Sequence, residues 1–201
     1  MAAPTADRPS ETGLPFSMAT LTGGLEAGIG AWRSDDEKEP LMRPLCDVSS
    51  IAIKKCLERR DVPTHLLQTV GRDEGPLMDH YHVIAVAEPT TGSVAVDGTY
   101  GQFLHEVAGE DYPELHLVRQ RFKQLPSRCI AFRPHSFEEA ISRVVDSMFG
   151  PDAGSEIVER AHSLYGALWD SANLRPYKPH DNERDSASRL VPHLEEVLAL
   201  R

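Results

Sequence analysis

The sequence has no long apolar run, few cysteines and a shortage of basic residues. No run approaches the about 18 apolar residues of a membrane-spanning helix, so we expect no such helix. The first residues lack the apolar stretch of a secretory signal, so we expect a cytoplasmic protein. Acidic residues outnumber basic ones by 31 to 21, giving a formal net charge of −10. This balance argues against nucleic acid and anionic membrane surfaces as partners.

The remaining composition is that of an ordinary soluble globular protein. The 201 residues are 40% hydrophobic and 26% charged, and no internal repeat is visible. Residues 1–39 carry clusters of Pro, Gly and Ser and end in a charge run, so we expect an irregular N-terminal arm. Its scattered apolar residues are enough for part of it to lie over the main domain. Residues 40–201 are expected to form that single domain.

The pattern of the main domain predicts an α+β fold with a helical C-terminal part. A helix is expected over 47–60, a strand over 65–70 and a β-hairpin over 81–87 and 93–97, with a polar loop at 71–76 between them. Further helices are expected over 136–149, 155–171 and 187–200, with a loop over 173–185. The domain is therefore expected to pack a helix on a small antiparallel sheet.

Three cysteines, Cys46, Cys56 and Cys129, are too few and too irregularly spaced for a disulfide framework or a Cys-x-x-Cys metal site. Cys46 stands where the first predicted helix begins, and the helix dipole and unpaired N–H groups there favour a thiolate. The same N–H groups can stabilise an oxyanion. Cys56 belongs to the apolar stripe of that helix, and we interpret it and Cys129 as structural.

The predicted hairpin brings a histidine and an aspartate together. His82 lies at the start of the first strand and Asp97 at the end of the second. A link of two or four residues puts them on one face, about 4.5 to 8 Å apart, whereas an unbulged three-residue link puts them on opposite faces. On one face, the carboxylate can orient the imidazole while the other ring nitrogen meets a thiol, as in a catalytic triad.

This order of residues resembles the transglutaminase-like branch of the papain-like cysteine enzymes. The resemblance covers residues 44–103 and depends on Cys46 at a helix start, on ERRDVPTHLLQTV, and on HVIAVAEPTTGSVAVDGTY. It implies Cys46 as nucleophile, His82 as general base and acid, and Asp97 as the residue that orients His82. It also implies a papain-like core and thiol-dependent acyl transfer from an amide or thioester, with no cofactor and no metal. The expected partner is a small-molecule or peptide acyl substrate, either free or bound to a carrier protein. The expected role of the enzyme is in biosynthesis.

Other interpretations of the same residues remain open. A peptidase or deamidase would use the same triad on peptides, and a binding protein would keep the fold without the chemistry. His80 and His82 share a strand face and, with Asp97, offer ligands for a divalent metal. No Gln closely precedes Cys46, so a second oxyanion donor would come from the N-terminal arm or from a residue such as Gln102.

Overall fold

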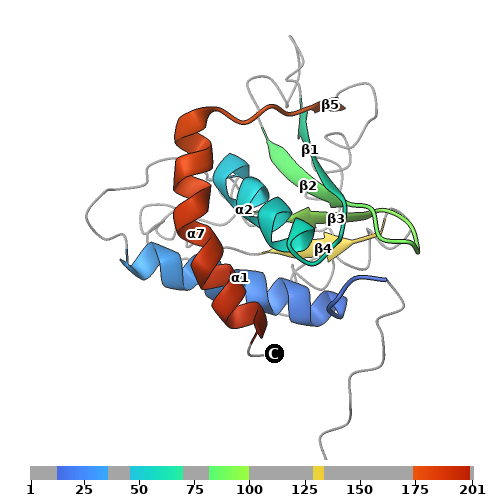
Figure 1. Ribbon diagram of the computed structural model, residues 1–201, viewed down its shortest axis with the longest axis horizontal. Helices are drawn as coiled ribbons and strands as arrows, with labels where there is room; N and C mark the ends of the chain where they lie inside the picture. Colours follow the sequence, from blue (N-terminus) through green and yellow to red (C-terminus); the bar gives the residue numbers. More distant parts are fainter. Residues whose placement is uncertain (1–12, 36–45, 70–81, 100–128, 134–173, 200–201) are drawn as a thin grey trace, which may run out of the picture.

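In the part of the chain that the structure describes, two helices precede a five-stranded antiparallel sheet and one helix follows it (Figure 1). The computed structural model describes residues 13–35, 46–69, 82–99, 129–133 and 174–199. The elements in this part are α1 (Met18–Asp35), α2 (Cys46–Glu58), β1 (Thr64–Thr69), β2 (Val83–Ala87), β3 (Val94–Asp97), β4 (Ile130–Phe132), β5 (Leu174–Pro176) and α7 (Asp181–Ala199). The predicted α+β class is confirmed.

The sheet is built around the predicted hairpin. Its strand order is β4-β3-β2-β1-β5, and every neighbouring pair is antiparallel. Ala87 pairs with Val94, so residues 88–93 form the link, in which Gly92 takes a positive φ of 108°. The apolar residues of β2 and β3 are buried throughout both strands. The hairpin and the strand before it are thus confirmed.

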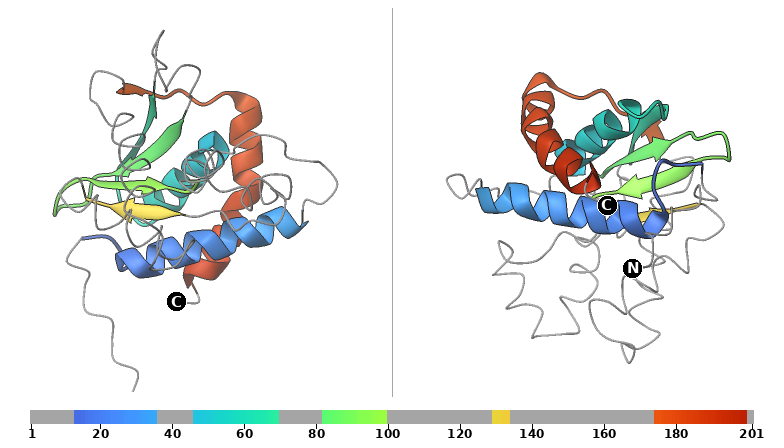
Figure 2. Two further views of the ribbon diagram at one scale, coloured as in Figure 1. Left: turned by 180° about the vertical axis from the view of Figure 1, so that it is seen from behind. Right: turned by 60° about the horizontal axis from the view of Figure 1, so that its bottom comes forward.

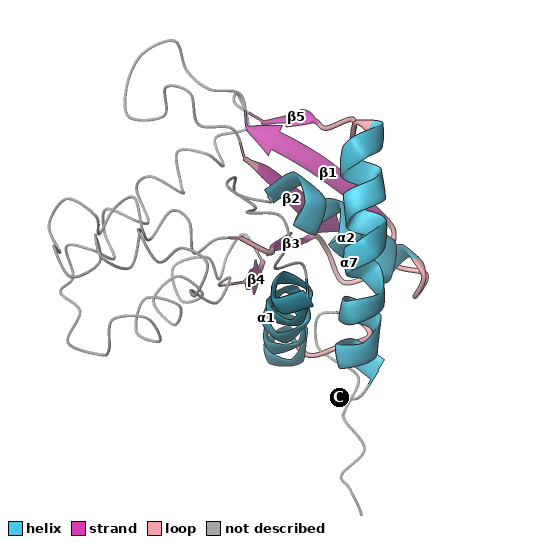
Figure 3. Cartoon of the chain, turned by 90° about the vertical axis from the view of Figure 1, so that its left-hand side faces the viewer, coloured by secondary structure: helices cyan, strands magenta, loops and turns pink. Residues whose placement is uncertain are grey.

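Helix α2 packs on β2 and β3 and carries α7 on its outer side (Figure 3). Its apolar stripe is buried, as the sequence predicts. The helix ends in a Schellman motif, in which Val62 N–H donates to the Leu57 carbonyl at 3.1 Å and Asp61 N–H to Glu58 at 3.1 Å. Asp61 takes the left-handed φ of 58° that this motif requires. The chain therefore turns sharply from α2 into β1.

The expectation of an irregular arm is wrong over Met18–Asp35, which forms α1. Ser17 caps the helix, because its hydroxyl oxygen accepts the Thr20 N–H at 3.1 Å. Four apolar residues spaced three or four apart make a buried stripe: Leu21, Leu25, Ile29 and Trp32. The proposed boundary between residues 39 and 40 lies outside the described residues.

Glycines explain why this helix was not predicted. A Cβ on Gly24 would lie 2.6 Å from Leu198, and a Cβ on Gly28 would lie 2.7 Å from Leu194. The glycines lower helix propensity, but they let α1 pass close to the C-terminal half of α7 (Figure 2). Tertiary packing therefore outweighs local propensity in this segment.

The C-terminal helix begins earlier than expected, so the prediction of a loop over 173–185 is wrong in part. Leu174–Pro176 pairs with β1 as an edge strand, and α7 starts at Asp181. Glu183 caps the start of α7, since its carboxylate accepts a hydrogen bond from the His180 N–H at 2.8 Å and one from the Tyr177 hydroxyl at 2.5 Å. Polar side chains that suggest a loop here serve as helix caps.

Several predictions fall on residues that the structure does not describe. The loop at 71–76 and the helices expected over 136–149 and 155–171 lie outside the described residues. None of the helices that are described is both long enough and apolar enough to traverse a bilayer.

Candidate functional site

His82 and Asp97 form a buried pair at adjoining ends of β2 and β3. The register that joins Ala85 to Val96 makes Asp97 the diagonal neighbour of His82 on the same face. His82 Nε2 lies 2.6 Å from Asp97 Oδ2, and the two side chains are 1% and 0% exposed. The predicted pairing of these residues is therefore present, and it is screened from solvent.

The second oxygen of the Asp97 carboxylate is held by Thr99, which the sequence analysis did not single out. The Thr99 N–H donates to Asp97 Oδ1 at 2.8 Å, and its hydroxyl lies 3.4 Å from the same oxygen. An aspartate followed two residues later by a threonine, just after a strand, is a signal for such a turn. With both oxygens engaged, the carboxylate has one orientation toward the imidazole.

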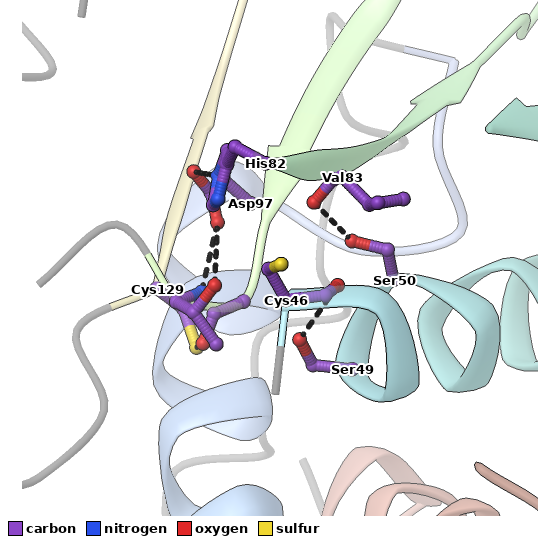
Figure 4. A network of polar contacts seen from close by, with 9 residues as sticks. Cys46, Ser49, Ser50, His82, Val83, Asp97 and Cys129 are labelled. Atoms are coloured by element: carbon purple, nitrogen blue, oxygen red, sulfur yellow. Dashed lines mark hydrogen bonds and ion pairs between the residues drawn. The ribbon is translucent and has the colours of Figure 1, made fainter. Parts of the chain in front are cut away.

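Cys46 is the first residue of α2, and it lies in the same buried cluster as His82 and Asp97, near enough to influence the pKa of the His82 ring (Figure 4). Burial by itself lowers the pKa of His82, since it disfavours the charged ring. The charge and hydrogen bond of Asp97, followed by the hydrogen bond and charge of Cys46, outweigh burial and raise the pKa of His82 to about 10. The carboxylate on one side of the ring and the sulfur near it thus both favour the imidazolium form.

Two consecutive serines fix the start of α2. The Ser49 hydroxyl donates to the Cys46 carbonyl at 3.3 Å within the helix, whereas the Ser50 hydroxyl donates to the Val83 carbonyl of β2 at 2.8 Å. Both serines are buried. Neither serine is among the site residues predicted from the sequence, although two adjacent polar residues within an apolar stripe are a signal of such contacts.

The side chain of Asp47 occupies one of the backbone amides at the start of α2. Its carboxylate accepts the Val48 N–H at 2.7 Å. Burial, which outweighs this hydrogen bond, raises the pKa of Asp47, and the charge of Glu183 on α7 raises it further. The Val48 amide, one of those expected to stabilise an oxyanion, is therefore already bonded.

Gly98 lets the end of β3 approach α2 closely. A Cβ on Gly98 would lie 3.0 Å from both Ser49 Cβ and Ile53 Cδ1. The Gly98 carbonyl also accepts the Cys129 thiol at 3.4 Å. A larger residue at this position would push Asp97 and its partners away from the helix that begins with Cys46.

The other residues considered in the sequence lie elsewhere or outside the described part. Cys56 is buried at the far end of α2, and Cys129 is buried beside Gly98. His80 and Gln102 fall outside the described residues. Within the ranges that the structure describes, no three His, Cys, Asp or Glu residues are grouped closely enough to hold a metal ion.

A scan against models of known protein families, a search of curated proteins and a search of solved structures find no match to this chain. The chemistry of the site is therefore argued from its own geometry.

Proposed function

We propose that this protein is a thiol-dependent acyl-transfer enzyme of the transglutaminase-like class. In this proposal Cys46 is the nucleophile, His82 is the general acid and base, and Asp97 orients His82. The substrate is an amide or thioester, and the product of the first step is an acyl group on Cys46. A helix that begins with the thiol and packs on strands carrying His and Asp supports a papain-like core.

The observation that carries the proposal is the line of three buried groups: carboxylate, imidazole and sulfur. Asp97 occupies Nε2 of His82 at 2.6 Å, so in this proposal the Cys46 sulfur exchanges its proton with Nδ1. A nucleophile within reach of a base that a third group orients is the general signature of an activated nucleophile. Three structural residues would not need this order of groups.

The first step forms the acyl-enzyme. The Cys46 sulfur, as a thiolate paired with the His82 imidazolium, attacks the carbonyl carbon and forms a C–S bond. His82 then donates its proton to the leaving nitrogen or sulfur, and the original C–N or C–S bond breaks. In this proposal the backbone N–H of Cys46 stabilises the oxyanion, since the amide of Val48 already donates to the Asp47 carboxylate.

The second step releases the acyl group to an acceptor. Water or an amine attacks the thioester carbonyl, and neutral His82 accepts the proton of the attacking group. The C–S bond breaks, and Cys46 leaves as the thiolate beside a renewed imidazolium. Water as acceptor gives amide hydrolysis, as in a peptidase or deamidase, whereas an amine gives an acyltransferase that forms a new amide bond.

The test uses p-nitrophenyl acetate as a small acyl donor and intact-protein mass spectrometry as the readout. We expect release of p-nitrophenol and an acetyl adduct on Cys46. Cys46→Ala should abolish the adduct and lower the rate by up to about 10⁶-fold, as for the loss of other catalytic nucleophiles. Cys56→Ala is the matched control, because both thiols lie on α2 and are 2% and 1% exposed.

The same experiment separates catalysis from its alternatives. Cys56→Ala should keep the rate of the parent protein within about threefold, since Cys56 lies outside the proposed site. An adduct that persists in Cys46→Ala would assign the chemistry to another residue. A parent protein that forms no adduct with this ester or with simple acyl thioesters would favour a binding protein that lacks acyl-transfer activity.

A further inference from the structure

We infer that Ser50 is a positioning residue of this site, which holds the helix carrying Cys46 against the strand that follows His82. This role rests on the proposed function, since it concerns the alignment of the same thiol and imidazole. Ser50 touches neither of the two groups directly in the contacts described above. It acts through the backbone of β2.

Ser50 lies where a single hydrogen bond can set the distance between the two catalytic groups. It stands one helical turn after Cys46, so both side chains face the sheet from the same side of α2. Its hydroxyl donates at 2.8 Å to the carbonyl of Val83, the residue next to His82 (Figure 4). The bond therefore links one position near the thiol to one position beside the imidazole.

The sheet alone does not supply this link. Val83 is paired with Gln68 of β1, while the ladder between β2 and β3 joins Ala85–Ala87 to Val94–Val96 and does not reach it. Neither pairing ties β2 to α2. Ser50 is fully buried, and a buried carbonyl without its donor is costly. Loss of the hydroxyl should let α2 and β2 shift relative to each other until the Val83 carbonyl finds another donor.

A small shift at this point is expected to affect chemistry more than folding. A misplacement of about 1 Å between reacting groups lowers rates by roughly 10²-fold. The hydrogen bond and charge of Cys46 also support the raised pKa of His82, so a displaced sulfur should lower that pKa. Asp97, which contributes more, stays in place and keeps the pKa of His82 above its ordinary value of 6.5.

The experiment compares Ser50→Ala with Thr64→Val. Both remove a buried hydroxyl that donates to a backbone carbonyl, but the Thr64 hydroxyl donates to Val62 at 3.0 Å, at the other end of β2 from His82. We expect Ser50→Ala to lower the acetylation rate of Cys46 by about 10- to 100-fold and to lower the pKa of His82 in an NMR titration. Thr64→Val should change the rate by less than about threefold, and Ser50→Thr should restore the rate that Ser50→Ala loses.

Each other outcome overturns the inference. Equal losses in Thr64→Val and Ser50→Ala would mean that any buried hydroxyl of the domain has the same effect and that Ser50 has no special role. A Ser50→Ala protein that no longer unfolds cooperatively would assign its hydroxyl to the stability of the whole domain. Parental rates and an unchanged His82 titration in Ser50→Ala would show that the sheet aligns the site without it. If the parent itself forms no adduct on Cys46, the proposed function fails instead.

Discussion

The two ends of helix α2 each carry a buried cysteine, and the two thiols differ in their neighbours. Cys46 begins the helix and lies beside the His82 ring, which Asp97 holds on its other side. Cys56 lies near the end of the helix and is a hydrogen-bond partner of Glu195 on α7. Burial, followed by the charge and hydrogen bond of Glu195, raises the pKa of Cys56 to about 12.

Both ends contain a cation and a carboxylate, so the order of the groups makes the difference. At Cys56, Arg60 binds both oxygens of Glu195 at 2.9 and 2.7 Å, and the carboxylate stands next to the thiol. At Cys46, the carboxylate stands behind the imidazole, and the cation stands next to the thiol. A neighbouring cation favours a thiolate, whereas a neighbouring carboxylate favours the neutral thiol. Burial alone therefore does not distinguish the two thiols, because both are buried and only their charged neighbours differ.

Among the charged groups around the two thiols, the largest expected effect comes from Asp97→Asn. This change removes the carboxylate that favours the charged ring beside Cys46. Without the carboxylate, the pKa of His82 should fall, because Asp97 supplies the main attraction that opposes burial. We expect the acetylation rate of Cys46 to drop by about 10²- to 10⁴-fold. Rates and an NMR titration of His82 would measure both changes.

Asp61→Asn is the control for this substitution. Asp61 is exposed after α2, and asparagine tolerates its left-handed φ of 58°. The control should retain the parental rate and His82 titration. An Asp97→Asn protein with the parental pKa of His82 would show that Asp97 does not hold the proton on the ring.

Much of this arrangement follows from local patterns in the sequence. The even-numbered link of the hairpin places His82 and Asp97 on one face, and Cys46 at a helix start follows from the apolar stripe of α2. These predictions succeed because strand alternation and helix periodicity act within short stretches. Local patterns therefore predict which residue types form the site and on which face of each element they lie.

Other parts depend on contacts between distant segments. Helix α1 was missed because Gly24 and Gly28 resemble helix breakers until α7 is present to pack on them. Ser50 and Thr99 are ordinary polar residues, and only the partners that the fold brings to them define their roles. The sequence pattern does not contain the distance between α2 and β2, which Gly98 allows to be short.

A second prediction separates the two ends of α2 by pH. The pKa of His82 is raised from 6.5 to about 10, so its contribution to stability is complete below pH 6.5 and is lost as the pH rises toward 10. The pKa of Cys56 is raised from 9.0 to about 12, so its contribution is lost in a higher window, between pH 9 and 12. Each loss should be of the order of a few kcal/mol in the free energy of unfolding.

Urea unfolding at a series of pH values measures the two windows. Asp97→Asn should flatten the decline between pH 6.5 and 10 and leave the upper one unchanged. Cys56→Ala should do the reverse. A single decline that both variants alter equally would mean that the two ends of α2 do not titrate independently.

The smallest effect is expected from Glu195→Gln, which tests whether the order of charges matters at Cys56. The change removes the carboxylate that faces the thiol and frees Arg60, whose charge already opposes the raised pKa. The pKa of Cys56 should fall below about 12, yet remain above its ordinary value, because burial is the largest cause of the shift. Stability should drop by only about 1 kcal/mol, since Arg60 and Glu195 are 21% and 26% exposed.

The pH dependence of alkylation at Cys56 measures the change in the pKa of this thiol, and urea unfolding measures the change in stability. If alkylation of Cys56 keeps its pH dependence, burial alone explains this thiol. The contrast with Cys46 would then depend on the imidazolium and not on the order of charges.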